Sequence, residues 1–145
     1  MVPTIGQQGY PPDVLARVDM GRFISAVDYL RAQRFRSLLI EDFNHALGNV
    51  DVIVTPTLPL AAPQLDASVV EIGGQTEHPL FWFPYLTRPI NMTGHPAVSV
   101  PCGFSRDKLP IGLQIIGRHF DETTTLRVAN AYEKATSYHL EKPPI

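Results

Sequence analysis

Two short segments with alternating side chains constrain the fold of this chain most. Residues 96–102 read PAVSVPC, residues 110–117 read PIGLQIIG, and the segment between them, GFSRDKL, is polar. Branched apolar residues recur at every second position of both segments: Val98, Val100, Ile111, Leu113 and Ile115. A period of two is typical of strands with one buried face, so we predict an antiparallel pair joined by a polar turn.

A longer apolar pattern lies earlier in the chain. From Arg22 to Leu47, apolar residues recur at spacings of three and four, which predicts one face of a long helix. These residues are Phe23, Val27, Leu30, Phe35, Leu38, Leu39, Phe43, Ala46 and Leu47. Before this helix, residues 1–20 are predicted to form a loop containing Gly6 and Gly9, with Asp13 capping a short helical turn.

A buried strand and a last helix complete the regular elements. The segment VDVIVTP predicts a short strand that ends at Pro56. Asp121 is the expected N-cap of a helix from Glu122 to Ser137. The residues expected to face inward are Leu126, Val128, Ala129, Tyr132 and Ala135.

Prolines shape the middle of the chain. The sequence has 14 prolines, and most of them lie between Pro56 and Pro110. Because proline fixes φ and lacks a backbone donor, we expect short elements and shaped loops here. Residues 57–80 are predicted to be irregular with a turn at Gly73–Gly74, and residues 81–90 to form a short helix or an extended run. No repeat or linker divides residues 1–145, so we expect a single domain or part of one.

Composition excludes several classes of partner. The net charge is −2 and the hydrophobic fraction is 44%, so the sequence has no basic stripe for nucleic acid and reads as an ordinary globular chain. No apolar run is long enough to span a membrane, and residues 1–14 lack the pattern of a secretory signal. One cysteine, Cys102, cannot form an internal disulfide. We therefore predict a cytoplasmic protein without nucleic-acid or membrane partners.

Cys102 and His95 are the first candidates for chemistry. A thiolate nucleophile needs a base within hydrogen-bond reach, and His95 lies seven positions before Cys102. A straight strand advances by about 3.3 Å per residue, which would place the two residues about 20 Å apart. This spacing favours a structural role for both residues over a catalytic pair.

Two further patterns also favour structural roles. Ser105 and Lys108 form the S-x-x-K spacing of some serine acylases, but Leu109-Pro110 blocks the helix that the motif needs. The segment from His119 to Glu122 could hold a metal, although helix capping by Asp121 explains it as well. We predict no catalytic residue, metal ligand or cofactor site in this chain.

Several phrases together resemble the closing third of an amidase-signature enzyme. They are ISAVDYLRAQRFR, DVIVTPTLPLAAP, RPINMTGHPAVSVPCG, LPIGLQIIGRHFDE and LRVANAYEKAT. The resemblance implies an α/β fold in which a mixed β-sheet is flanked by helices. It also implies amide hydrolysis by a Ser–Ser–Lys triad, and it gives Asn91, Gly94 and Pro96 scaffold roles around a tight corner. In this pattern Cys102 occupies a strand-end position that is not catalytic.

The triad itself cannot be assigned here. No two serines are adjacent among Ser25, Ser37, Ser68, Ser99, Ser105 and Ser137, and the lysines are Lys108, Lys134 and Lys142. We therefore expect the C-terminal segment of an amidase that hydrolyses carboxylic amides to acid plus ammonia or amine, with the triad in a missing N-terminal part. The alternatives are an inactive binding or structural remnant and a fragment of a glutamine amidotransferase subunit.

The segment before Asn91 bears on the substrate. Family members that use glutamine carry an acidic residue there, whereas residues 79–90 contain no Asp or Glu. The resemblance thus favours an amide less polar than glutamine, with Arg17, Tyr85 and Thr87 as substrate-binding residues. We also expect exposed aromatic residues in the segment FWFPY, and self-association or binding of the missing N-terminal part.

Overall fold

The computed structural model describes residues 10–65 and 67–142 of the chain. Contacts divide the chain into two compact units, Met1–Leu38 and Leu39–Ile145. Residues 1–9, which include the predicted loop glycines Gly6 and Gly9, lie outside the described residues. The expectation of a single domain stays a prediction.

The first unit is helical. It contains α1 (Pro12–Met20), η1 (Gly21–Phe23) and the beginning of α2 (Ala26–Ala46), whose end belongs to the second unit. Asp13 was predicted to precede the first helix, but α1 begins at Pro12, because proline is suited to the first helical position. The N-terminus of α2 is capped by Ser25, whose Oγ accepts a hydrogen bond from the Asp28 backbone N–H at 3.1 Å.

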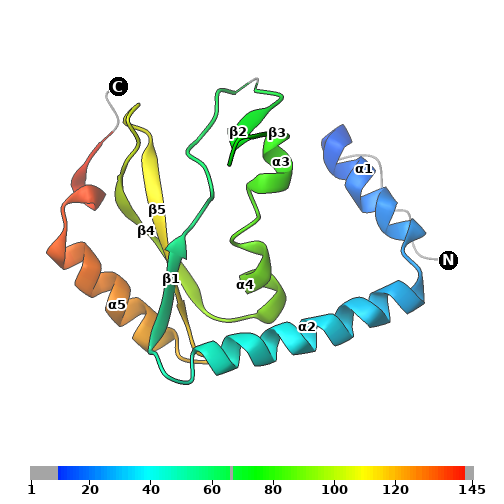
Figure 1. Ribbon diagram of the computed structural model, residues 1–145, viewed down its shortest axis with the longest axis horizontal. Coiled ribbons are helices and arrows are strands. Elements are labelled where there is room, and N and C mark those ends of the chain that lie inside the picture. Colours follow the sequence, from blue (N-terminus) through cyan, green and yellow to red (C-terminus); the bar gives the residue numbers. More distant parts are fainter. Residues whose placement is uncertain (1–9, 66, 143–145) are drawn as a thin grey trace. The chain divides into compact units, whose positions relative to one another are not determined.

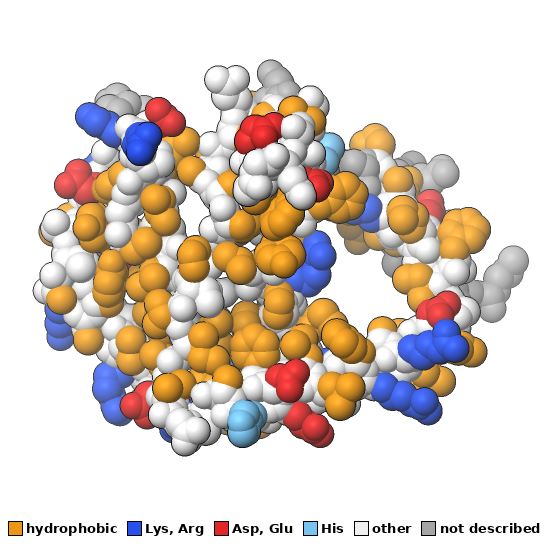
Figure 2. Space-filling model, in the orientation of Figure 1, with side chains coloured by type: hydrophobic (Ala, Val, Ile, Leu, Met, Phe, Trp, Pro, Cys, Tyr) orange, Lys and Arg blue, Asp and Glu red, His pale blue; other side chains and the backbone are white. Residues whose placement is uncertain are grey.

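The predicted long helix is confirmed, but only the last part of its apolar stripe is covered: Leu47 is buried and Phe43 is half-buried, whereas the stripe up to Leu38 is exposed. No residue of α2 is buried, and α1 likewise has apolar residues at its surface. Figure 2 shows hydrophobic side chains along both helices. The exposed members of the stripe are Phe23, Val27, Leu30, Phe35 and Leu38. A stripe of this size on a helix surface is typical of a face that packs against another part of a protein.

The second unit is built on a three-stranded antiparallel sheet with the order β1-β5-β4 (Figure 1). Its strands are β1 (Val52–Pro56), β4 (Ala97–Phe104) and β5 (Pro110–Gly117). The predicted strand and the predicted antiparallel pair are therefore confirmed, and β5 also pairs with β1. The α/β fold class is confirmed too. The strand pairs among the described residues are all antiparallel, so a mixed sheet would need further strands from a longer protein.

Helix α5 (Glu122–Ala135) covers one face of this sheet. The core consists of Val100, Ile115 and Ala129, and Val52, Val98, Leu113, Val128 and Tyr132 pack against it. Asp121 caps the helix as predicted, because its side chain accepts a hydrogen bond from the Thr124 N–H at 3.1 Å. Two predicted inward residues are wrong: Leu126 is 58% exposed, and Ala135 is also exposed.

Thr125 takes the place that the pattern assigned to Leu126. The Thr125 side chain is only 2% exposed, and it lies over Gly117, where an added Cβ would come within 2.0 Å of its Oγ1. The glycine leaves room for a small polar side chain at this point of the helix–sheet contact. The buried residues of α5 are therefore Thr125 and Ala129.

The segment between β1 and β4 is less irregular than predicted. A hairpin of β2 (Val70–Ile72) and β3 (Gln75–Glu77) surrounds the Gly73–Gly74 turn, where both glycines have positive φ. Two short helices follow, α3 (Pro79–Trp82) and α4 (Arg88–Thr93), and Gly94 ends α4 in the left-handed conformation. A last 3-10 turn, η2 (Tyr138–Leu140), follows α5. Among the described residues, no helix combines the length and apolar character needed to cross a membrane.

Candidate functional site

The sheet face opposite α5 carries a row of polar side chains. The register aligns Thr55, Gln114 and Ser99 across the three strands, and their side chains alternate with those that face α5. Gln114 is only 5% exposed, and its Nε2 donates hydrogen bonds to Thr55 Oγ1 at 3.1 Å and to the Leu86 carbonyl at 3.3 Å. The second bond ties the segment before α4 to the centre of the sheet.

A pair of hydroxyl groups lies next to Gln114 on this face. Thr57 Oγ1 and Ser99 Oγ are 2.6 Å apart, although the residues come from opposite edges of the sheet. They meet above Gly112 of the central strand, where an added Cβ would lie 2.7 Å from Thr57 Oγ1 and 2.8 Å from Ser99 Oγ. The hydroxyl pair therefore depends on the absence of a side chain at Gly112.

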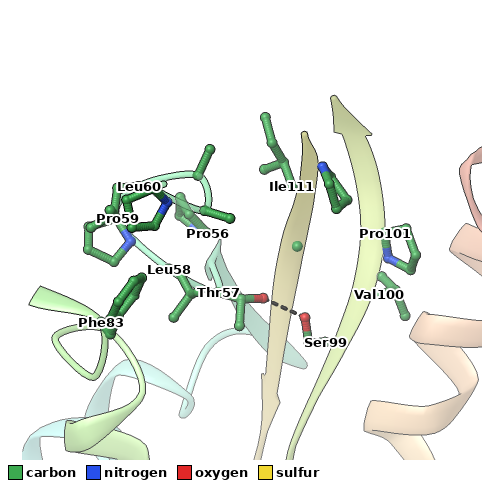
Figure 3. A pocket seen from close by; sticks show the side chains of 15 residues that line it. Pro56, Thr57, Leu58, Pro59, Leu60, Phe83, Ser99, Val100, Pro101 and Ile111 are labelled. Atoms are coloured by element: carbon green, nitrogen blue, oxygen red, sulfur yellow. Dashed lines mark hydrogen bonds between the residues drawn. The ribbon is translucent and has the colours of Figure 1, made fainter. Parts of the chain in front are cut away.

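Two open pockets adjoin the hydroxyl pair, and Thr57 and Ser99 line both of them. The first, called here the apolar pocket, has a volume of about 680 Å³. Apart from the two hydroxyl residues its lining is apolar or glycine: Pro56, Leu58, Pro59, Leu60, Ala61, Ala62, Pro63, Phe83, Val100, Pro101, Pro110, Ile111 and Gly112. In Figure 3, Leu58 and Phe83 lie on one side of the hydroxyl pair, and the strand that carries Ser99 lies on the other.

The second, called here the polar pocket, has a volume of about 450 Å³. Its lining adds amide, hydroxyl and imidazole groups to the hydroxyl pair, and it consists of Thr57, Thr87, Ile90, Asn91, Gly94, His95, Ala97, Val98, Ser99 and Gln114. No Asp, Glu, Lys or Arg is found among the described residues that line either pocket. The site can therefore offer hydrogen bonds and apolar contacts, but no formal charge.

His95 lies at the buried end of the polar pocket. Its side chain is 5% exposed, its ring centroid is 3.9 Å from that of His119, and its Nε2 is 3.3 Å from Asn44 Oδ1. His95 Nδ1 and His119 Nε2 are buried without a hydrogen-bond partner among the described residues. Burial, and then the charge of His119, lower the pKa of His95. The neutral imidazole is thus the favoured form in the folded protein.

The predicted substrate-binding residues occupy different places. Thr87 lines the polar pocket, and its Oγ1 donates a hydrogen bond to the Pro84 carbonyl at 3.4 Å. Tyr85 lines neither pocket; it is 54% exposed and its ring lies 4.8 Å from that of Trp82. Arg17 is exposed on α1 in the first unit. A role in substrate binding stays a prediction for all three residues.

The aromatic segment around Tyr85 is only partly exposed. Phe81 and Tyr85 are exposed as expected, whereas Trp82 and Phe83 are half-buried. Phe83 forms part of the wall of the apolar pocket.

The residues of the alternative catalytic patterns have contacts of their own. His95 lies beside His119, whereas the half-buried Cys102 lies near the other end of β4. Burial, and then the nearby Cys102, raise the pKa of Tyr132. Ser105 Oγ accepts hydrogen bonds from the backbone N–H groups of Asp107 and Leu109, as expected for a turn. Within residues 10–65 and 67–142, no group of three or more His, Cys, Asp or Glu side chains could hold a metal ion.

Thr57, Ser99 and Gln114 were not predicted from the sequence to form a site. One signal was present: Gly112 interrupts the side-chain pattern of β5, and a glycine inside a strand often marks a close approach of neighbouring groups. The partners of that glycine could not be named, because they depend on the register of both outer strands.

The comparison with protein-family models gives a match to the family described as Amidase over residues 1–126. The chain belongs to the amidase family. Its curated relatives include a glutamyl-tRNA(Gln) amidotransferase subunit from Bacillus mycoides (strain KBAB4), with 41% identity over 142 residues, and one from Shouchella clausii (strain KSM-K16), with 43% over 145 residues. These alignments cover 93% and 95% of this chain but 28% of each relative. The chain thus spans about 28% of the length of these curated relatives.

Solved structures support the same family assignment. A crystal structure of an amidase matches 88% of this chain with a TM-score of 0.82 and 28% identity, and the match covers 29% of that protein. A bacterial aryl acylamidase of the amidase signature family matches 92% of the chain with a TM-score of 0.71 and 25% identity, covering 29% of that protein. The glutamyl-tRNA(Gln) amidotransferase subunit from Thermotoga maritima matches 94% with a TM-score of 0.63 and 32% identity, covering 30% of it.

Proposed function

We propose that this chain is the C-terminal part of an amidase and forms one wall of its amide-binding site. The observation that carries the proposal is the amidase family match, which extends over most of the chain. The uncharged wall of Thr57, Ser99 and Gln114 supports it, because hydroxyl and amide groups complement the carbonyl and N–H groups of an amide substrate.

On this proposal the bond-breaking residues are outside the chain. Amide hydrolysis needs an activated nucleophile and a proton acceptor, and no pair of adjacent serines accompanies a lysine in this sequence. The chain would position the amide, while the nucleophile of the triad, in the longer protein, attacks the carbonyl carbon of that amide. The exposed stripe of α2 would then pack against that remaining part or against a second copy of the chain. We place this amidase in the cytoplasm.

A second candidate is a glutamine amidotransferase subunit. It is favoured by the identity of 41% and 43% to curated relatives with that name. It is disfavoured by residues 79–90, which contain Arg88 but no acidic residue for the ammonium group of glutamine. The uncharged lining of both pockets also provides no partner for an amino acid's charged groups.

A chimeric enzyme tests the proposal. The segment of the Shouchella clausii protein that aligns with this chain is replaced by the 145 residues, and hydrolysis of benzamide and of glutamine is measured. We expect the chimera to hydrolyse benzamide in preference to glutamine, and the isolated chain to hydrolyse neither. A folded chimera without amidase activity would contradict the proposal, whereas preference for glutamine would favour the second candidate. Hydrolysis of either amide by the isolated chain would rule out the proposal that the chain only forms a wall of the amide-binding site.

A further inference from the structure

The hydroxyl pair stands at the boundary of two chemically different pockets. On one side, the apolar pocket has no polar side chain apart from the pair itself. On the other side, the polar pocket gathers the side chains of Thr87, Asn91 and Gln114. Thr57 and Ser99 are therefore the only side chains shared by an apolar and a polar compartment among the described residues.

The pair has hydrogen-bonding capacity left for a ligand. Each hydroxyl can donate one hydrogen and accept at its oxygen, and the bond between Thr57 and Ser99 uses only one of the two hydrogens. One O–H donor and free lone pairs therefore remain. The contact is open to solvent, so a ligand can reach it.

These features select an uncharged ligand that has an apolar part beside a group with both a donor and an acceptor. A charged group would lose its hydration without gaining an opposite charge in either pocket. A primary or secondary amide has the required carbonyl acceptor and N–H donor. The volume of about 680 Å³ lies within the range of small-molecule sites and accommodates an aromatic ring or a branched alkyl group.

We propose that the apolar pocket binds the aromatic or alkyl part of a neutral amide, and that the Thr57–Ser99 hydroxyl pair binds its amide group. This assignment rests on the proposed amidase function and names the substrate class. The amide carbonyl accepts the free hydroxyl hydrogen, while an amide N–H donates to the neighbouring hydroxyl oxygen. Gly112 is a positioning residue in this arrangement, because a side chain there would push the two hydroxyls apart.

Ligand binding to the isolated chain tests the assignment without any catalysis. Benzamide, benzoate and glutamine are each titrated into the labelled 145-residue chain, and the backbone amide resonances of Ser99 and Ile111 are followed by NMR. We expect benzamide to shift these resonances, and benzoate and glutamine to bind at least about tenfold more weakly because both carry charges.

Two matched variants examine the role of the hydroxyl. Thr57→Val removes it while keeping the side-chain shape, and it should weaken benzamide binding about three- to tenfold, as expected for one lost hydrogen bond. Thr123→Val makes the same change at an exposed position on α5 and should leave binding unchanged. If Thr57→Val does not fold, Ser99→Ala provides the same comparison.

The outcomes separate this assignment from the proposed function. Equal binding of benzamide and benzoate, absence of shifts at Ser99 and Ile111, or unchanged benzamide affinity of Thr57→Val would each overturn the assignment. An active chimera together with any of these results would leave the amidase function in place and refute only the pocket. Benzamide binding as described, together with an inactive chimera, would refute the amidase function and keep the binding site.

Discussion

The contact between Gly117 and Thr125 gives the sharpest prediction for stability. A Cβ at position 117 would lie 2.0 Å from Thr125 Oγ1, far inside contact distance. Thr125 is 2% exposed, and its hydroxyl donates to the Asp121 carbonyl at 3.2 Å, so it cannot swing into solvent. Overpacking of this kind costs about 1–3 kcal/mol, and we expect Gly117→Ala to destabilise the second unit by that amount.

A double-mutant cycle tests the reason for this cost. Thr125→Ala alone should cost about 0.5–1.5 kcal/mol, because one buried hydrogen bond is lost. In the double variant the nearest atoms to the new Cβ would be the Asp121 carbonyl oxygen and the Cβ of residue 125, each at 3.4 Å, which is ordinary contact. The double variant should therefore be more stable than the sum of the single effects by about 1–2 kcal/mol.

Urea unfolding followed by circular dichroism measures all three variants. Gly21→Ala is the matched control, because Gly21 has a helical φ of −57° and no atom within 4 Å of an added Cβ. It should be neutral or stabilise by about 0.4–1 kcal/mol. Additive effects of Gly117→Ala and Thr125→Ala, within about 0.5 kcal/mol, would refute the proposed steric conflict.

Three other predictions concern His95, Cys102 and α2. The folded-state pKa of His95 is lowered from 6.5, so the stability that its neutral form contributes should be present above about pH 6.5 and be lost as the pH falls through the folded-state pKa. The free energy of unfolding in urea should therefore differ less between pH 7.5 and pH 5 for His95→Asn than for the unchanged chain. Cys102→Ser should leave kcat/KM of the chimera unchanged, since Cys102 and His95 lie near opposite ends of β4; a large loss would restore the thiol mechanism. Sedimentation should find the chain self-associated and the Leu30→Gln/Phe35→Gln variant less so, because both side chains are exposed on α2, whereas a compact monomer of the unchanged chain would contradict this.

The elements that could be predicted from the sequence are those set by local patterns. The alternation in β4 and β5 and the polar turn between them were sufficient for the antiparallel pair. Asp121 was sufficient for the start of α5, because an N-cap acts on the N–H group only three residues later. Val128, Ala129 and Tyr132 face the core as predicted, whereas Leu126 was wrong, since Thr125 lies over Gly117 instead. That choice depends on the strand beneath the helix and not on the helix pattern.

The candidate site depends on contacts between distant parts of the sequence. Thr57 and Ser99 are 42 positions apart, and Gln114 and Thr55 are 59 apart. Neither pair is set by local spacing, because each requires β5 to lie between β1 and β4 in one particular register. Thr87 was selected from its place before the Asn91 corner, and it lines the polar pocket, while its role in substrate binding stays a prediction.

The uncharged wall also has a consequence for the product. On the proposed function, hydrolysis of an amide yields a carboxylic acid, which is ionised near neutral pH. A carboxylate in the apolar pocket would lose hydration without meeting a cationic side chain, since Lys and Arg are absent from the described lining. The neutral amide keeps its hydrogen bonds to Thr57 and Ser99 without this loss. The isolated chain, which contributes no cationic side chain to this pocket, should therefore bind the acid product more weakly than the neutral amide, and the ratio of benzoate to benzamide affinity measures this difference.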